Sequence, residues 1–162
     1  MKKDPAPKII DTLVAIADGS VAAAIKPIEA AHALGNIYYY ILMTNLDVNV
    51  NYGNYGGKDG FAEAWSYNLQ VARSADRYDH RQLLRDSGFY LGKMRMKGFG
   101  SVPVVGSEDC ISNSGTPVVT SNDKAAICWF DKAIEDSPEG SNNQEIIYNR
   151  NVCRKNIEIN GR

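Results

Sequence analysis

A breaker-rich turn between two helical segments is the feature that most constrains how this chain can fold. The turn Ser137-Pro-Glu-Gly-Ser-Asn-Asn143 separates two stretches, 122–136 and 143–160, whose apolar residues recur at helical spacing. A Pro, a Gly and two Asn residues within this turn favour a reversal of the chain over a continuing helix. The sequence therefore predicts a C-terminal helical hairpin over residues 122–160.

The hairpin brings two of the three cysteines almost level with each other. With helix ends at 136 and 143, Cys128 lies eight residues before the turn (136 − 128) and Cys153 ten after it (153 − 143). The difference is about 3 Å of helical rise. We predict a Cys128–Cys153 disulfide in oxidising conditions, with Cys110 left free. Two alternatives stay open: Cys110 pairs with either partner, or a reducing compartment keeps all three as small buried apolar residues.

Four more segments have the apolar spacing of helices. They are predicted over 6–18, 28–43, 61–72 and 80–96. Gly19 can end the first in a left-handed conformation, and Pro27 can open the second at its first helical position. Apolar residues surround almost the whole circumference of 28–43, which is typical of a central helix. The predicted fold is mainly α, with five to six helices in one compact bundle-like domain.

Domain organisation follows from length and composition. A chain of 162 residues with 44% apolar content can bury one core. We expect a single helical domain over 1–162, with a helical core at 6–97, an irregular segment at 98–121 and the hairpin at 122–160. The irregular segment is rich in Gly, Ser and Pro, and its apolar pieces 102–105 and 117–120 could form a short β-hairpin.

Charge and hydropathy limit the classes of partner and compartment. A formal net charge of −1 and a pI near 6.1 argue against a global footprint for nucleic acid or anionic membranes. No apolar run approaches the roughly 20 residues of a membrane-spanning helix. The start of the chain lacks a secretory apolar region, so the level cysteine pair favours an extracytoplasmic location only if a leader has already been removed.

The histidines and cysteines do not have the spacing of a metal site. There is no C-x-x-C, and neither His32 nor His80 has a neighbouring Cys or Glu at ligand spacing. We therefore expect no metal and no cofactor. His32 lies on the apolar second helix, where a core histidine bonded to a backbone carbonyl or a tyrosine is the expected role.

Arg73 and His80 form the one candidate catalytic pair. Six residues separate them, and this spacing resembles that of the helical HEPN ribonuclease family, in which Arg and His act on an RNA phosphate and a 2′-hydroxyl. The resemblance implies a small helical RNA-processing enzyme. In that family both groups usually lie near the start of one helix, whereas Asp76-Arg-Tyr-Asp79 predicts a break here. The alternative for His80 is a capping-region residue beside Asp79.

Consecutive tyrosines provide the candidate partner-binding residues. Tyr38, Tyr39 and Tyr40 on one helix point in directions about 100° apart, so at least one ring should reach the surface. Tyr52 and Tyr55 follow in an Asn- and Gly-rich loop. Tyrosine is enriched at interface centres because it supplies a large contact area with little loss of entropy. We predict partner contacts at Tyr40, Tyr52 and Tyr55; alternatively, such rings fill the space between helices.

A third function class comes from basic residues. The run Lys93-Met-Arg-Met-Lys97 could meet phosphate together with the arginines Arg73, Arg77, Arg81 and Arg85, as in a nucleic-acid-binding regulator. The run also sits at a predicted helix C-terminus, where the helix dipole favours cations. Our leading expectation is a small domain without catalytic activity that binds another protein, of the inhibitory, immunity or adaptor type.

Overall fold

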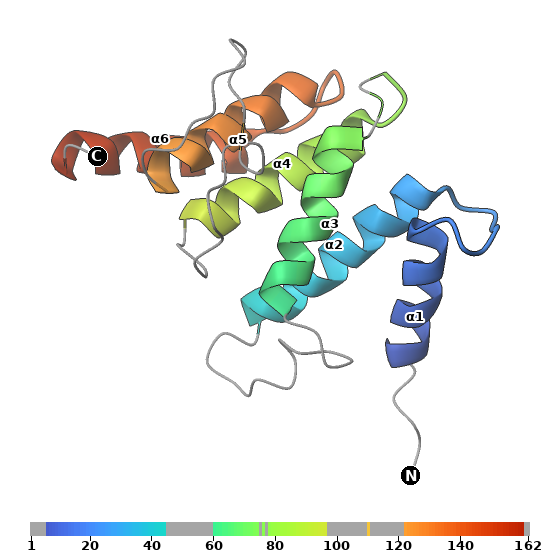
Figure 1. Cartoon of the computed structure of the whole chain (residues 1–162). Helices are drawn as coiled ribbons and strands as arrows, with labels where there is room; N and C mark the ends of the chain where they lie inside the picture. The colour runs from blue at the N-terminus through green and yellow to red at the C-terminus, as the bar shows by residue number, and fades with distance from the viewer. Residues whose placement is uncertain are drawn as a thin grey trace. The chain divides into compact units, whose positions relative to one another are not determined.

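Six α-helices form the described part of the chain, and no strand occurs in it (Figure 1). The computed structural model describes residues 6–44, 60–74, 76, 78–96, 110 and 122–160. The helices are α1 (Ala6–Ala17), α2 (Pro27–Thr44), α3 (Gly60–Ser74), α4 (Arg81–Met96), α5 (Asn122–Asp136) and α6 (Gln144–Asn160). The predicted mainly α class is confirmed. The pieces 102–105 and 117–120, predicted as a possible hairpin, lie outside the described residues.

Local sequence signals mark the ends of α1 and α2 as predicted. Gly19 has φ 82°, the left-handed conformation that a side chain would strain. Pro27 is the first residue of α2, where its missing N–H has no intrahelical partner to lose. The side chain of Glu29 caps the N-terminus of α2, since its Oε1 accepts a 3.0 Å hydrogen bond from the backbone N of Lys26.

The chain divides into two compact units, Met1–Ser74 and Ala75–Arg162. The boundary falls inside the segment predicted as one helical core, 6–97, and the single-domain assignment of 1–162 stays a prediction. The first unit contains α1, α2 and α3, with α2 packed against both of the others. Figure 1 shows α2 and α3 crossing each other.

Helix α2 supplies half of the core residues of the first unit. The core residues on it and on its two neighbours are Ile10, Ile16, Ala30, Ala31, Leu34, Tyr38, Tyr39, Ala64, Trp65 and Val71. Five of these ten come from α2, in accordance with its predicted central position. Tyr40, two residues beyond Tyr38, is exposed, so the helix is not buried around its whole circumference.

A glycine lets α3 approach α2 closely. A Cβ built on Gly35 would lie 3.0 Å from three side-chain atoms of Asn68. Asn68 is fully buried, and its Nδ2 donates hydrogen bonds of 2.8 Å to the carbonyl of Ala64 and 3.4 Å to that of Gly35. The side chain of Asn68 thus links the two helices through backbone acceptors.

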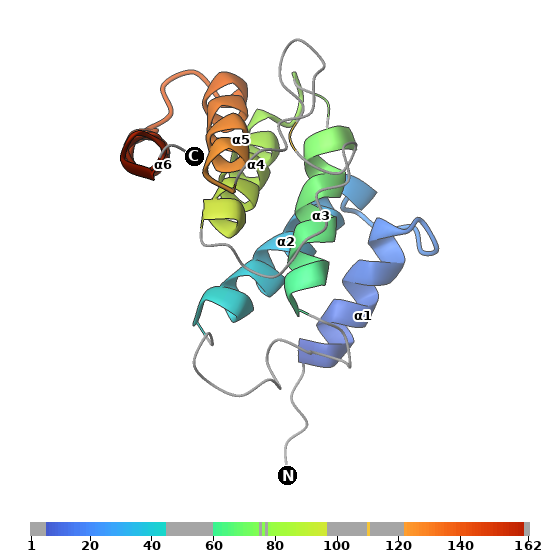
Figure 2. The same ribbon diagram turned by 60° about the vertical axis from the view of Figure 1, so that its left-hand side comes forward.

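The second unit is built on the pair α4 and α5. Figure 2 shows the two helices side by side, with α6 seen nearly end-on. Gly88 and Gly92, one turn apart on α4, face α5 directly. A Cβ on Gly88 would lie 3.0 Å from Cβ of Ala133, and one on Gly92 would lie 2.5 Å from a ring carbon of Phe130. The absence of side chains at both positions sets the distance between the helices.

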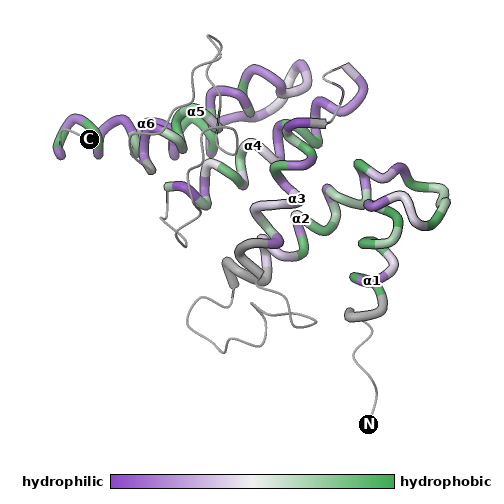
Figure 3. The backbone as a smooth tube through the Cα atoms, in the orientation of Figure 1, coloured by the Kyte–Doolittle hydropathy of each residue, from purple (hydrophilic) through white to green (hydrophobic). Residues whose placement is uncertain are grey.

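Helix α6 completes this unit by packing against α5. Its Ile146 and Cys153 join one buried cluster with Ala126, Phe130 and Ala133 of α5. Most of α6 is hydrophilic (Figure 3), and only three of its residues are buried, the third being Asn149. The apolar contact between α6 and α5 is therefore short.

Gly92→Ala tests the α4–α5 contact. The added methyl group meets the Phe130 ring, and overpacking costs more than the about 1 kcal/mol by which Ala exceeds Gly in helix propensity. We expect a net loss of about 1–2 kcal/mol in the free energy of unfolding, measured by urea denaturation. The control Asn151→Ala, on the exposed face of α6, should change it by less than about 0.5 kcal/mol. A Gly92→Ala protein as stable as the parent would contradict the close approach.

Candidate functional site

Tyr40 is the predicted partner-binding residue that the structure describes. It is 56% exposed, whereas its neighbours Tyr38 and Tyr39 are 0% and 5% exposed. The rings of Tyr39 and Tyr40 meet edge to face, with centroids 5.7 Å apart and an interplanar angle of 78°. This geometry is a favoured one for aromatic pairs. Tyr52 and Tyr55, the other two predicted contacts, lie outside the described residues.

Two partly exposed apolar residues extend the surface around Tyr40. Ala33 and Ile37 precede it by seven and three residues on α2. These spacings place all three side chains on one face of the helix. We call Ala33, Ile37 and Tyr40 the α2 face. It is the described surface that fits the predicted partner contact.

The predicted catalytic pair is not brought together within either unit. Arg73 lies in the last turn of α3 in the first unit and is exposed. His80 precedes α4 in the second unit, and its backbone N donates a 2.9 Å hydrogen bond to the carbonyl of Asp76. The Nδ1 of His80 is buried and has no hydrogen-bond partner within the described residues. His80 thus occupies the capping region, as its alternative interpretation predicted.

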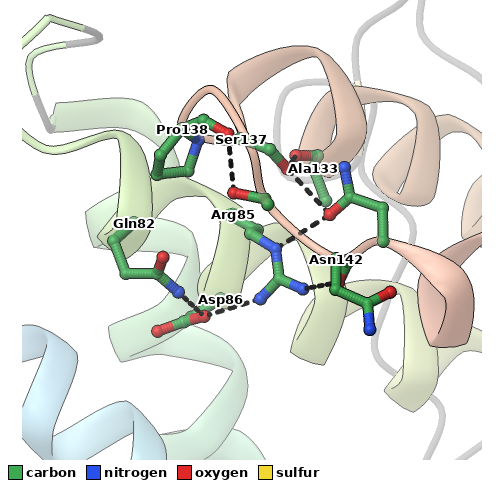
Figure 4. Close-up of polar contacts among 9 residues, drawn as sticks. Gln82, Arg85, Asp86, Ala133, Ser137, Pro138 and Asn142 are labelled. Carbon is green, nitrogen blue, oxygen red and sulfur yellow. Dashed lines mark hydrogen bonds and ion pairs between the residues drawn. The ribbon is translucent and has the colours of Figure 1, made fainter.

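Arg85 is bonded to the turn between α5 and α6 (Figure 4). Its Nε donates a 3.0 Å hydrogen bond to Oδ1 of Asn143, and its Nη2 donates a 2.8 Å hydrogen bond to the carbonyl of Asn142. Its Nη1 lies 3.5 Å from Oδ1 of Asp86. The planar guanidinium group therefore donates hydrogen bonds to two separate acceptors of the turn, which a lysine could not do from one planar group.

Further hydrogen bonds fasten the same turn to α4 and α5. Nη1 of Arg81 donates to the carbonyl of Ser137 at 3.3 Å. The Ser137 hydroxyl donates to the carbonyl of Ala133 at 2.6 Å and lies 3.1 Å from Oδ1 of Asn143. The arginine row that suggested phosphate binding thus supplies internal contacts at Arg81 and Arg85.

The basic run at the end of α4 also has partners inside its unit. Nζ of Lys93 donates to Oδ1 of Asn149 on α6 at 3.4 Å, and Arg95 is 4% exposed. Arg77 and Lys97 have no described side chains. A cationic surface formed by the whole run, as a nucleic-acid-binding regulator requires, is not seen in the described residues.

The cysteine pairing differs from the prediction. Cys110 and Cys128 form a disulfide with S–S 2.00 Å and Cα–Cα 6.0 Å, and Cys153 is free and buried. The predicted Cys128–Cys153 bridge is therefore wrong, and the alternative with Cys110 holds. Cys128 lies two residues from both Ala126 and Phe130, which face α6, so it is rotated about 200° from each around α5. Cys128 and Cys153 are at similar heights on α5 and α6, but Cys128 points away from α6, so the two sulfur atoms cannot meet.

Cys153 has the properties of a core residue. Burial raises the pKa of its thiol to about 12, and the carboxylate of Asp123 adds to the effect. A thiol with this pKa is almost fully protonated at neutral pH, whereas the thiolate is the nucleophile. Cys153 is thus chemically quiet in the folded chain.

Within the described ranges, no three His, Cys, Asp or Glu side chains are grouped so that they could hold a metal ion. No described helix has the length and apolarity that crossing a bilayer requires. His32 lies half-buried on α2.

Two exposed tyrosines were missed by the sequence analysis. Tyr78 in the turn before α4 is 84% exposed, and Tyr148 on α6 is 69% exposed. Tyr78 stands within Asp76-Arg-Tyr-Asp79, a turn that the sequence does predict and that could have indicated an exposed ring. Tyr148 follows Ile146 and Ile147, so its exposure depends on which face of α6 packs against α5, and the sequence does not show this.

Comparison with known proteins gave no relative of this chain. No protein-family model matches it, and no significant match was found among curated proteins or solved structures.

Arg85→Lys tests the clamp on the α5–α6 turn. Lysine keeps the charge but cannot reach both turn acceptors from one planar group. We expect a loss of about 1–2 kcal/mol in the free energy of unfolding, since the half-buried Oδ1 of Asn143 loses a charged donor. The matched change Arg154→Lys, on the exposed face of α6, should have almost no effect. Equal stability of the two variants would show that the fork geometry contributes nothing.

Cys110→Ser tests the disulfide. The bridge closes a sequence separation of 18 residues, for which the chain-entropy account gives about 3 kcal/mol. We expect this loss in non-reducing buffer and almost none relative to the parent when both are fully reduced. Peptide mapping without reductant should recover the peptides containing Cys110 and Cys128 as one species. A joined pair containing Cys128 and Cys153 would contradict the structure.

Proposed function

We propose that this protein acts by binding another protein through the α2 face, as a small domain of the inhibitory, immunity or adaptor type. The observation that carries the proposal is the exposure of Tyr40, 56%, next to the buried Tyr38 and Tyr39. An exposed aromatic ring on a rigid helix has the form of an interface anchor.

The packing around Tyr40 supports this role. Binding requires that interface side chains lose rotamer freedom, and this loss reduces affinity. The edge-to-face contact with the buried Tyr39 ring restricts Tyr40 before a partner arrives. Ala33 and Ile37, whose side chains are smaller, provide an apolar surface beside the ring. Together they suit a partner that presents a pocket for one aromatic side chain.

Tyr52 and Tyr55 enlarge the proposed contact. They belong to residues 45–59, which directly follow the end of α2 at Thr44. Loops rich in Asn and Gly frequently carry binding residues on a rigid scaffold. In this proposal the α2 face is the helical part of the contact, and Tyr52 and Tyr55 add further area.

The compartment in which this binding occurs is proposed from the disulfide. Disulfides persist in oxidising surroundings and are rare in the reducing cytosol. The pair Cys110 and Cys128 is within bonding distance. This supports an extracytoplasmic location for the protein, and hence an extracytoplasmic partner.

A partner can be sought by cross-linking from position 40. A photoreactive phenylalanine analogue at Tyr40 should capture one protein, and unmodified protein should compete for it. The same analogue at Tyr78, which is more exposed but lies in the other unit, is the matched control. Capture of the same proteins from both positions would indicate non-specific contact and would count against the proposal.

Tyr40→Ala gives the quantitative test with the purified partner. Loss of an aromatic anchor should weaken the complex by about 2 kcal/mol or more, which is roughly 30-fold in Kd. Thermal unfolding should change little, because the ring is exposed. Tyr78→Ala should bind as the parent does. Unchanged affinity of Tyr40→Ala would refute the proposal, and loss of an RNA-cleaving activity in Arg73→Ala and His80→Ala would favour the enzyme instead.

A further inference from the structure

The hydroxyl of Tyr38 is a buried polar group. The residue is 0% exposed, and its Oη makes no hydrogen bond within the described part of the chain. A buried hydroxyl that gives up water without a replacement lowers stability, so such groups in folded proteins call for an explanation. A bound molecule that donates a hydrogen bond would provide one.

The ring that stacks on Tyr38 comes from α3. The rings of Tyr38 and Tyr67 are stacked, with centroids 6.2 Å apart and an interplanar angle of 10°. Glu63 precedes Tyr67 by four residues, and this spacing places both on one face of α3. Glu63 and Tyr67 are partly exposed. Tyr67 thus places a partly exposed ring against the buried ring of Tyr38, with the partly exposed Glu63 on the same face of α3.

The electrostatic environment of both tyrosines is negative. Burial is the main cause that raises the pKa of Tyr38 to about 12, and Glu63, Tyr67 and Asp11 raise it further. Burial, Glu63 and Asp18 raise the pKa of Tyr67 in the same direction. The carboxylates of Asp11, Asp18 and Glu63 thus disfavour the negatively charged phenolate form of these tyrosines. The same field favours a positive charge here.

We propose that Tyr38, Tyr67 and Glu63 form a binding site for a primary ammonium group, as carried by a lysine side chain or a small alkylamine. An ammonium ion has three donors and no acceptor, which suits the Tyr38 hydroxyl and the Glu63 carboxylate. The face of the Tyr67 ring adds a cation–π contact. The site is independent of the proposed function, because Tyr38 lies about 200° around α2 from Tyr40.

The test uses butylammonium chloride with the full chain. Tyrosine ring signals are followed by NMR at constant ionic strength, with sodium chloride as the ionic control and n-butanol as the neutral analogue. We expect saturable shifts of the Tyr38 and Tyr67 rings with butylammonium alone. Tyr38→Phe and Glu63→Gln should each weaken binding about tenfold or more, as loss of a hydrogen bond to a charged group does.

A matched control and three results decide the outcome. Tyr148→Phe, an exposed tyrosine on α6, should bind butylammonium as the parent does. The absence of saturable shifts would overturn the proposal. Equal shifts with n-butanol would show an apolar crevice instead, and unchanged affinity of Tyr38→Phe would assign the hydroxyl to a bound water only. Glu63→Gln, at a partly exposed position, gives the same decision if Tyr38→Phe does not fold.

Discussion

The close approach of α4 and α5 at two glycines is the contact on which the second unit depends. Because Gly92 has no side chain, the ring of Phe130 can occupy the space beside the α4 backbone. Phe130 is then the fully buried centre of the cluster that also receives Ile146 and Cys153 of α6. The position of α6 therefore rests on a contact between two other helices. A side chain at 92 would displace the residue against which α6 packs.

In the first unit, too, a glycine lets two helices approach closely, but the side chain that fills the space is polar. Gly35 admits a buried side chain, but the side chain is Asn68, which is tied to two backbone carbonyls. A polar side chain thus lies beside Gly35, whereas Gly88 and Gly92 of α4 lie beside the side chains of Ala133 and Phe130. The Oδ1 of Asn68 and the hydroxyl of Tyr38 have no hydrogen-bond partner in the part of the unit that is described. Buried polar atoms without a hydrogen-bond partner lower the stability of the fold. A bound ligand that bonds to them would offset this loss.

Many of the described cations of the second unit serve its own architecture. Arg81 and Arg85 hold the α5–α6 turn, Lys93 bonds to Asn149, and Arg150 pairs with Asp131 at 3.0 Å. A guanidinium that donates to backbone carbonyls presents fewer donors to an outside phosphate. This distribution gives these four cations a role inside the unit.

The sequence by itself determined the helices and their ends, because Gly19, Pro27 and the turn Ser137 to Asn143 act on local backbone angles and hydrogen bonds. It also indicated that one of three consecutive tyrosines would be exposed. Only the tertiary structure decided that Tyr40 is the exposed one and that Cys128 joins Cys110. Both outcomes depend on the rotation of a helix about its own axis, which is set by packing against other helices and not by the residues near each position.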